Sequence, residues 1–429
     1  MTLVIASILF ACTYITIASE RFNRTYVAVG GALLVLAFGL LDTADAFRSS
    51  STGIDWAVLA LLLGMMIIVG VFVESGVFDY IGATVSQRFR SRPGLLVAVL
   101  FAITSCASAL LDNVTTVLLI VPMTIQVCQR MRIDPVPVVI GVALASNIGG
   151  AGTLIGDPPN IIIGGKAGLG YGDFLLHAGP AAAGVTGMLL LAARWFTKPE
   201  RHEWPHAVPS LPVPVVRDPR LVGLAGAVLA GVTAAFLLQS VLHRAPSVVA
   251  LSGAGLLLLL TRESPQRFLR HVAWETLVFF AGLFVLVGAL VKTGAIDAVA
   301  SWLQTMTSGS AMLGASVLLV ASGLISGIVD NIPYVTAMTP ITMQLVHSLP
   351  RQSGGGALWW ALALGADFGG NATIIGASAN IVAVGLASKA GYTIRFRDFV
   401  RYGLPVTVGS IAFAWVYVYL RYFAFTTGV

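Results

Sequence analysis

The first half of the chain contains the stretches ALLDNVTTVLLIVP (109–122) and SNIGGAGTLIGDPPNIII (146–163), and the second half contains GIVDNIPYVTAMTP (327–340) and ADFGGNATIIGASANIV (366–382). In each half an Asp-Asn pair interrupts one apolar run, and a Gly-Gly pair followed by polar residues interrupts the next. Non-helical backbone at membrane depth is tolerated only where it is buried in protein or lines a cavity. These stretches therefore predict two re-entrant hairpins and two interrupted helices within a membrane protein.

The composition places the whole chain in the membrane class. Of its 429 residues, 57% are hydrophobic and only 10% are charged, with a mean hydropathy of +0.89. Soluble domains carry about 25% charged residues. Apolar runs long enough to cross a bilayer occur along the entire sequence. We predict an all-α polytopic membrane protein with no sizeable soluble domain.

Ten apolar stretches are predicted to cross the membrane. They lie at about 2–18, 24–41, 54–74, 136–165, 174–196, 220–240, 246–261, 274–292, 357–388 and 402–425. The crossings at 136–165 and 357–388 are the interrupted ones, and the hairpins cover 94–127 and 311–347. No basic region precedes residues 2–18, so we expect a retained first span rather than a signal peptide.

The two halves of the sequence are related by an internal repeat. Adding 218 to a residue number takes Trp56 to Trp274 and Asp112 to Asp330, and the Gly-rich stretches align with an offset of 220. The matches concentrate on Gly, Asp, Asn and Pro, which makes chance a poor explanation. The fold is predicted to be a duplicated one.

The repeats are predicted at residues 1–197 and 220–429, joined by a cytoplasmic linker at 198–219. Each repeat has five transmembrane helices, one of them interrupted, plus one re-entrant helical hairpin. Because five is an odd number, the second repeat is inverted relative to the first.

Charge placement gives the orientation. If both termini lie outside, 19 of the 25 Lys and Arg residues fall on the cytoplasmic side, as the positive-inside rule requires. We therefore predict a multi-pass protein of the bacterial cytoplasmic (inner) membrane. The basic residues form no stripe with interleaved aromatics, so nucleic acid is not an expected partner. Cys12, Cys106 and Cys128 have no disulfide or metal spacing, and we expect buried small side chains there.

Four carboxylates fall at predicted membrane depth: Asp112, Asp157, Asp330 and Asp367. Each would cost about 2.5–3.5 kcal/mol at a lipid-exposed helix centre, so each needs a compensating role. They are expected to face a hydrated cavity, bind a cation or carry a proton, although a single Asp could also cap a half-helix. Asp157 aligns with Ala377, so the two half-sites are chemically unequal.

Neutral polar side chains and glycines surround these carboxylates in the sequence. Unwound segments expose carbonyl groups and helix ends that can bind an ion or polar solute, and glycine permits the break. The remaining candidate binding residues are Asn113, Thr115, Thr116, Asn147, Gly149, Gly150, Thr153, Asn160, Asn331, Gly369, Gly370, Asn371, Thr373, Ser378 and Asn380. Within the full set, Asp112, Asn113, Asp330 and Asn331 are the candidates for binding sodium.

Over nearly its full length the sequence resembles the ion transporter superfamily, most closely the arsenite permease and P-protein (pink-eyed dilution) branch, including actinobacterial arsenic-transport membrane proteins. The motifs that carry the resemblance are LLDNVTTVLL, SNIGGAGTLIGDPPNIII, DNIPYVTAMTP and ADFGGNATIIGASAN. The resemblance implies a homodimer with a scaffold and a moving transport domain, working by elevator-like alternating access. The superfamily also includes sodium/proton antiporters and sodium-coupled divalent-anion symporters.

The hairpin motifs depart from the symporters' Ser-Asn-Thr signature, which maps here onto Asp112-Asn113-Val114 and Asp330-Asn331-Ile332. An Asp replaces the Ser, and an apolar side chain replaces the Thr. An unprotonated Asp would repel an anionic substrate but suits a proton, a sodium ion or a neutral hydroxylated solute such as arsenous acid.

These residues predict a secondary active transporter that exports arsenite or antimonite, coupled to a proton gradient. A sodium/proton antiporter and a sodium-coupled, dicarboxylate-type anion carrier are the alternatives. No cofactor is expected beyond a proton or sodium as coupling ion. The sequence has no P-loop, so energy would come from an ion gradient or from a separate ATPase subunit.

An enzyme and a channel are the alternatives from other protein classes. An intramembrane aspartyl protease would share a proton between Asp112 and Asp330, but its GxGD flank is missing, and we expect no enzyme. A channel stays open as an alternative, because broken helices could also line a pore.

Overall fold

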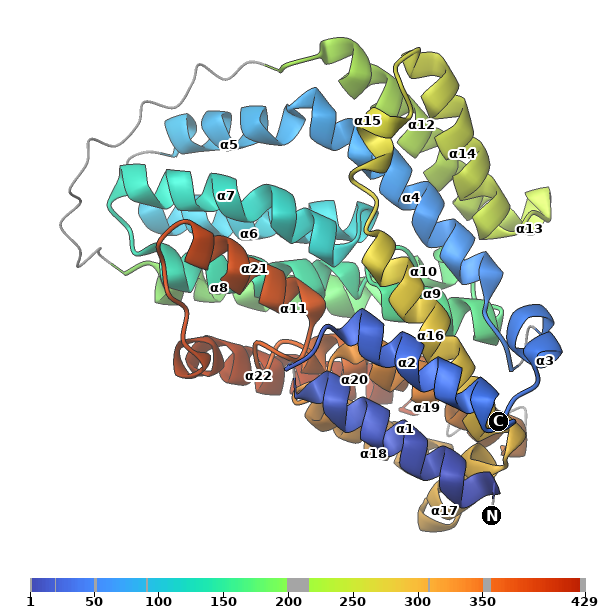
Figure 1. Ribbon diagram of the computed structural model, residues 1–429. Helices are drawn as coiled ribbons and strands as arrows, with labels where there is room; N and C mark the ends of the chain where they lie inside the picture. The colour runs from blue at the N-terminus through green and yellow to red at the C-terminus, as the bar shows by residue number, and fades with distance from the viewer. Residues whose placement is uncertain are drawn as a thin grey trace.

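The computed structural model describes residues 2–19, 21–49, 52–89, 92–198, 216–307, 309–349 and 356–424. Every regular element within these ranges is a helix (Figure 1). The predicted all-helical fold class is confirmed.

The helices follow one another in two long series. The first comprises α1 (Thr2–Ala18), α2 (Arg24–Ala37), α3 (Thr43–Arg48), α4 (Trp56–Ser75), α5 (Val77–Arg88), α6 (Pro93–Leu110), α7 (Asn113–Met131), α8 (Pro135–Gly150), α9 (Pro158–Ala167), α10 (Tyr171–His177), α11 (Gly179–Leu191) and the 3-10 turn η1 (Ala192–Phe196). The second comprises α12 (Pro219–Leu237), α13 (Gln239–Leu242), α14 (Pro246–Thr261), α15 (Gln266–Leu269), α16 (Trp274–Lys292), α17 (Ala295–Met306), α18 (Ala311–Ser326), α19 (Asn331–Ser348), α20 (Ala357–Gly369), α21 (Ser378–Lys389) and α22 (Phe396–Tyr422). Most of the predicted linker, 199–215, lies outside the described residues, and the division into repeats stays a prediction.

Helix length agrees only partly with the ten predicted crossings. Among the described residues, six helices are long and apolar enough to cross a membrane, and two bent pairs would raise the number to eight. The six include α6 and α7, which the sequence assigns to a hairpin. Four of the predicted crossings contain shorter apolar helices, such as α1 and α14. Length alone therefore does not separate spans from hairpin arms.

Two helices that the sequence did not predict, α5 and α17, follow glycines at matching positions. Gly76 and Gly294 have φ values of 72° and 80°, in the left-handed region that an L-residue rarely adopts. Gly76 is the C-cap of α4 and Gly294 follows the C-cap of α16, and each glycine redirects the chain into the amphipathic helix that follows. This explains in physical terms why the repeat keeps glycine at both places.

The helices pack in two groups. In one group α4 packs against α12 and α14, and α2 packs against α1 and α16 (Figure 1). The other group contains the hairpin helices and the interrupted helices, with α7 packed against α21 and α9 against α19. These two pairings join an early hairpin or half-helix to a late one, so both halves of the chain build one interior.

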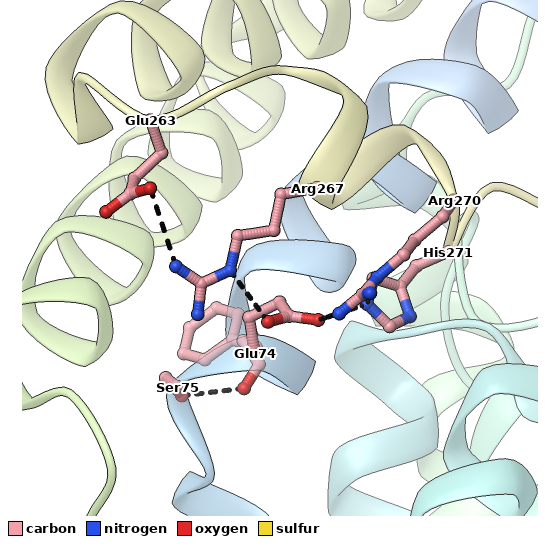
Figure 2. A network of polar contacts seen from close by, with 7 residues as sticks. Glu74, Ser75, Glu263, Arg267, Arg270 and His271 are labelled. Carbon is pink, nitrogen blue, oxygen red and sulfur yellow. Dashed lines mark hydrogen bonds and ion pairs between the residues drawn. The ribbon is translucent and has the colours of Figure 1, made fainter.

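Glu74 at the end of α4 ties the first half of the chain to the segment around α15 (Figure 2). Its carboxylate accepts from Arg267 Nε at 2.9 Å and lies 2.7 Å from His271 Nε2, and it also pairs with Arg270. Lys292 at the end of α16 pairs with Asp42 at 2.9 Å and with Asp45. Both residues lie at the ends of long apolar helices, and both form ion pairs there.

The cysteine prediction is correct at only one of its three positions. Cys128 is buried, whereas Cys12 and Cys106 are exposed on the surface of the protein. A small apolar thiol is compatible with either location in a membrane protein, because lipid is as apolar as the protein interior.

Replacing Gly149 by Ala should destabilise the protein. A Cβ at this position would lie 2.1 Å from the backbone oxygen of Ser105, so α6 and α8 could no longer approach each other closely. Overpacking of this kind costs about 1–3 kcal/mol or more. Thermal unfolding in detergent should show a clear fall in Tm. Gly255→Ala is the matched control, because no described atom outside the adjacent backbone of its own helix lies within 4 Å of its Cβ position. Equal stability of the two variants would contradict the prediction.

Candidate functional site

Each hairpin turns at an Asp that caps the helix following it. Asp112 accepts from the Thr115 backbone N–H at 2.9 Å and from the Thr115 hydroxyl at 2.5 Å. Asp330 accepts from the Ile332 N–H at 3.0 Å. Asp is a preferred N-cap residue, since its carboxylate satisfies N–H groups that have no partner within the helix. The capping role considered for these acids is therefore part of what each one does.

Each tip is bound to the break of the interrupted helix that follows it. The N–H of Asn113 donates to the carbonyl of Gly156 at 3.1 Å, and the N–H of Asn331 donates to the carbonyl of Gly376 at 3.2 Å. At each break two glycine backbones pass each other, so a Cβ on Gly156 would lie 2.6 Å from the oxygen of Gly150. The same contacts occur in both halves of the chain.

Asparagine side chains join the two tips to one buried carboxylate. Asn113 Nδ2 donates to Asp157 Oδ2 at 2.8 Å and to Asn147 Oδ1 at 3.2 Å. Asn331 Nδ2, from the other hairpin, donates to the same Asp157 oxygen at 3.2 Å. Asp157 is thus the point at which the two hairpins meet.

Asn147 makes the second connection between the halves. Its Nδ2 donates to Asn371 Oδ1 and to Asn380 Oδ1, both at 3.0 Å. Asn380 Nδ2 in turn donates to backbone carbonyls at the break in its own interrupted helix, those of Gly370 and Thr373. Asn160 Nδ2 makes the equivalent hydrogen bonds in the first half. We call this set the carboxamide cluster: Asn113, Asn147, Asp157, Asn160, Asn331, Asp367, Asn371 and Asn380.

The carboxamide cluster contains two acids that are fully buried. Asp157 and Asp367 have 0% exposure, and neither forms an ion pair within the described ranges. Within the described residues, Asp157 Oδ1 has no hydrogen-bond partner, and neither oxygen of Asp367 accepts a hydrogen bond of normal geometry, although the Asn160 side chain interacts with the Asp367 carboxylate. Among the predicted site residues, four further buried atoms have no hydrogen-bond partner in the described part of the chain: Asn113 Oδ1, Thr116 Oγ1, Asn160 Oδ1 and Asn371 Nδ2. Such atoms are rare and costly, and they are typical of a place where a proton, ion or solute binds.

The other predicted site residues support the cluster from outside it. Thr153 donates from its hydroxyl to the Ala109 carbonyl at 2.6 Å, and Thr373 donates likewise to Gly327 at 2.7 Å. Thr115 is bonded to Asp112. The glycines Gly149, Gly150, Gly369 and Gly370 lie where backbones approach closely. These residues hold the hairpins against the interrupted helices, and they do not present polar atoms to the cluster.

Arg24 is a residue that sequence reasoning missed, because it was counted only as a topology signal. Its Nη1 lies 3.2 Å from Asp330 Oδ2, and it also binds the Ser378 hydroxyl, which donates to the same oxygen at 2.6 Å. The argument that Asp330 repels anions was incomplete, because this Arg neutralises its charge. The sequence indicated only that Asp330, an acid at membrane depth, needs a partner, and it did not indicate which residue that partner is.

No hydrogen bond or ion pair joins Asp112 to Asp330 in the part of the chain that the structure covers. The described residues also contain no group of three or more His, Cys, Asp or Glu arranged to hold a metal ion. Sodium can be held by carbonyl and amide oxygens. The sodium assignment to Asp112, Asn113, Asp330 and Asn331 stays a prediction.

Comparison with known proteins adds the family to this geometry. The model of a family described as "Citrate transporter" matches residues 14–365. The chain belongs to the citrate transporter family. A "46 kDa membrane protein" of Mycobacterium leprae is 46% identical over 426 residues, covering 98% of this chain and 99% of that protein. An "Uncharacterized transporter" of Mycobacterium tuberculosis is 46% identical over 423 residues, with the same coverage.

Two further proteins are similar to the chain at lower identity. The P protein of Sus scrofa is 33% identical over 488 residues, covering 95% of this chain and 58% of that protein. The resemblance to the P protein is confirmed, and the matches support the ion transporter superfamily without singling out arsenite permeases. The YdaH transporter of Alcanivorax borkumensis, described as having "an unusual topology", shares the fold with a TM-score of 0.61 at 15% identity, covering 97% and 98% of the two chains. The chain is a membrane transporter and not an enzyme.

Replacing Asn147 by Ala should strongly destabilise the cluster. The change removes the donor to Asn371 and Asn380, and each buried acceptor left without a partner costs about 1–3 kcal/mol. Thermal unfolding should show a larger loss than in the control Asn23→Ala, which removes only a helix cap worth about 1 kcal/mol. If both variants unfolded at the same temperature, the cluster would not hold the two halves together.

Proposed function

We propose that this protein is a secondary active transporter whose solute and coupling ion bind at the carboxamide cluster. The observation that carries the proposal is the pair of fully buried acids, in which Asp157 Oδ1 and both oxygens of Asp367 accept no hydrogen bond of normal geometry within the described residues. Ionisable groups buried in a membrane protein typically mark ion pathways and proton relays. Their place between two hairpins and two broken helices is the arrangement that transporters use for alternating access.

We propose arsenous acid, a small neutral hydroxylated solute, as the substrate, exported in exchange for protons. Amide groups such as those of Asn113 and Asn371 can donate to and accept from hydroxyl groups. Citrate, the substrate in the family's description, carries several negative charges and would need cationic partners. The cluster residues include no Lys or Arg, and two of them are acids. These features favour a neutral solute over an anion at the cluster.

In the proposed mechanism a proton alternates with the solute at the cluster. With Asp157 and Asp367 protonated, their carboxyl groups can donate hydrogen bonds, and the buried charge is removed. Loss of the protons leaves carboxylates that must be compensated, so binding of solute and release of protons are coupled. Asp157 precedes the first residue of α9, where the helix end carries a partial positive charge that stabilises a carboxylate.

A sodium/proton antiporter is the second candidate function. The unpartnered side-chain oxygens of Asn113 and Asn160 near the two acids are ligands that suit sodium. In this case the same carboxylates would bind sodium and protons in turn. The homodimer, the moving transport domain and the ATPase subunit stay predictions.

Flux into proteoliposomes tests both functions. With an imposed pH gradient, the wild type should move arsenite, and Asp157→Asn and Asp367→Asn should each lower the rate about tenfold or more, corresponding to about 1.4 kcal/mol. Asp42→Asn, which changes an exposed acid paired with Lys292, is the control and should retain wild-type flux. Sodium-dependent proton movement with no arsenite flux would reject the substrate and favour the antiporter. Unchanged flux in both cluster variants would reject the site.

We also propose that both chain termini face the outside of the cytoplasmic membrane, as the distribution of Lys and Arg indicates. A protease-sensitive tag fused to either end should be cleaved in intact spheroplasts. Protection of both tags until the membrane is permeabilised would reverse the orientation.

A further inference from the structure

A cavity of about 320 Å³ lies between the second hairpin tip and the helix group that contains α2 and α16. Arg24 and Phe279 line it from α2 and α16, Asp330 lines it from the hairpin tip, and Ser378 and Ile381 line it from α21. Asn331, directly after Asp330, donates to Asp157 in the carboxamide cluster. The cavity therefore reaches the residue next to the cluster.

Arg24 joins the two sides of this cavity. From the first residue of α2 it pairs with Asp330, at 3.2 Å, and with the Ser378 hydroxyl. Its guanidinium also lies 5.2 Å from the ring centre of Phe279 on α16. The Asp330 side chain is only 9% exposed, whereas that of Arg24 is 32% exposed, so the pair is shielded at one end and reachable from the cavity at the other.

The first hairpin tip has no such partner. Asp112 is bonded to Thr115 of its own helix, and no ion pair to it occurs among the described residues. Both tips carry the same Asp-Asn pair and the same bond to a break, so the difference lies in the side chains that contact each Asp: Arg24 and Ser378 at Asp330, and Thr115 at Asp112. One tip is tied to a neighbouring helix group by a charged pair, and the other is not.

We propose that Arg24 is a positioning residue for transport, which ties the tip at Asp330 to α2 and α16 and must release it for the hairpin to move. While the pair is intact, the tip stays beside the cavity, and Asn331 is held against Asp157. Breaking the pair frees the tip and lowers the fraction of molecules in which the cavity is open beside it. This inference rests on the proposed function only in taking the second hairpin as a moving part.

Accessibility of the cavity to a thiol reagent tests the proposal. Cys12→Ser, Cys106→Ser and Cys128→Ser remove the native thiols, and Ile381→Cys places one in the cavity wall. A membrane-impermeant maleimide, applied to right-side-out and to inverted vesicles, should react from one side only. Adding Arg24→Gln should slow that reaction about fivefold or more, in the range of typical coupling between sites.

Two further variants separate positioning from simple loss of structure. The charge swap of Arg24→Asp with Asp330→Arg should restore labelling towards the parent rate, whereas each single change should slow it. Arg21→Gln makes the same change of charge at an exposed neighbouring residue and should label like the parent. If Arg24→Gln failed to yield monodisperse protein, Arg24→Lys would replace it, with an intermediate rate expected.

The proposal is overturned if Arg24→Gln labels as fast as Arg21→Gln, or if the swap is no better than the single variants. Reaction from both sides at equal rates would also overturn it. The labelling requires no transported solute, so a failure of arsenite flux with these labelling results intact would reject the substrate and leave the role of Arg24 standing.

Discussion

The structure depends on satisfying broken backbone and buried polar groups without help from the surrounding lipid. A helix interrupted at membrane depth leaves N–H and C=O groups for which hydrocarbon offers no partner, each costing several kcal/mol. Here the N–H groups at the hairpin tips, from Asn113 and Asn331, bind the carbonyls of Gly156 and Gly376. Each hairpin tip and the break in the interrupted helix that follows it therefore satisfy each other's backbone groups. Neither would be stable alone in the membrane.

Glycine allows the hairpins and the interrupted helices to approach closely enough for these hydrogen bonds. A Cβ on Gly149 would meet the Ser105 backbone at 2.1 Å, and one on Gly369 would meet the Gly323 backbone at 2.5 Å. Hairpin helices and interrupted helices therefore touch backbone to backbone in both halves. Threonine hydroxyls at Thr153 and Thr373 add a further bond across each contact. The result is a closely packed frame that brings the asparagine side chains together.

Within this symmetric frame the chemistry is unequal, and the inequality suits a coupled transporter. Asp157 of the first half aligns with Ala377, and Asp367 of the second half aligns with Asn147. One acid therefore comes from each broken helix, but from different positions along it. The hairpin tips differ as well, because Asp330 is paired with a basic side chain and, among the described residues, Asp112 is not. The frame gives two similar halves, and the substitutions within it give the two halves different polar side chains.

The sequence by itself determined the membrane class, the repeated hairpins and breaks, and the acids at membrane depth. Each of these follows from local patterns: hydropathy, glycine pairs, and costly charges within apolar runs. Only the tertiary structure decided that both tips donate to Asp157, that Asn147 reaches Asn371 and Asn380, and that Arg24 pairs with Asp330. Arg24 and Asp330 are 306 positions apart, and a hydropathy pattern carries no information about which distant side chains meet. Such pairings depend on how helices from both halves pack, which is a property of the whole chain and of no segment within it.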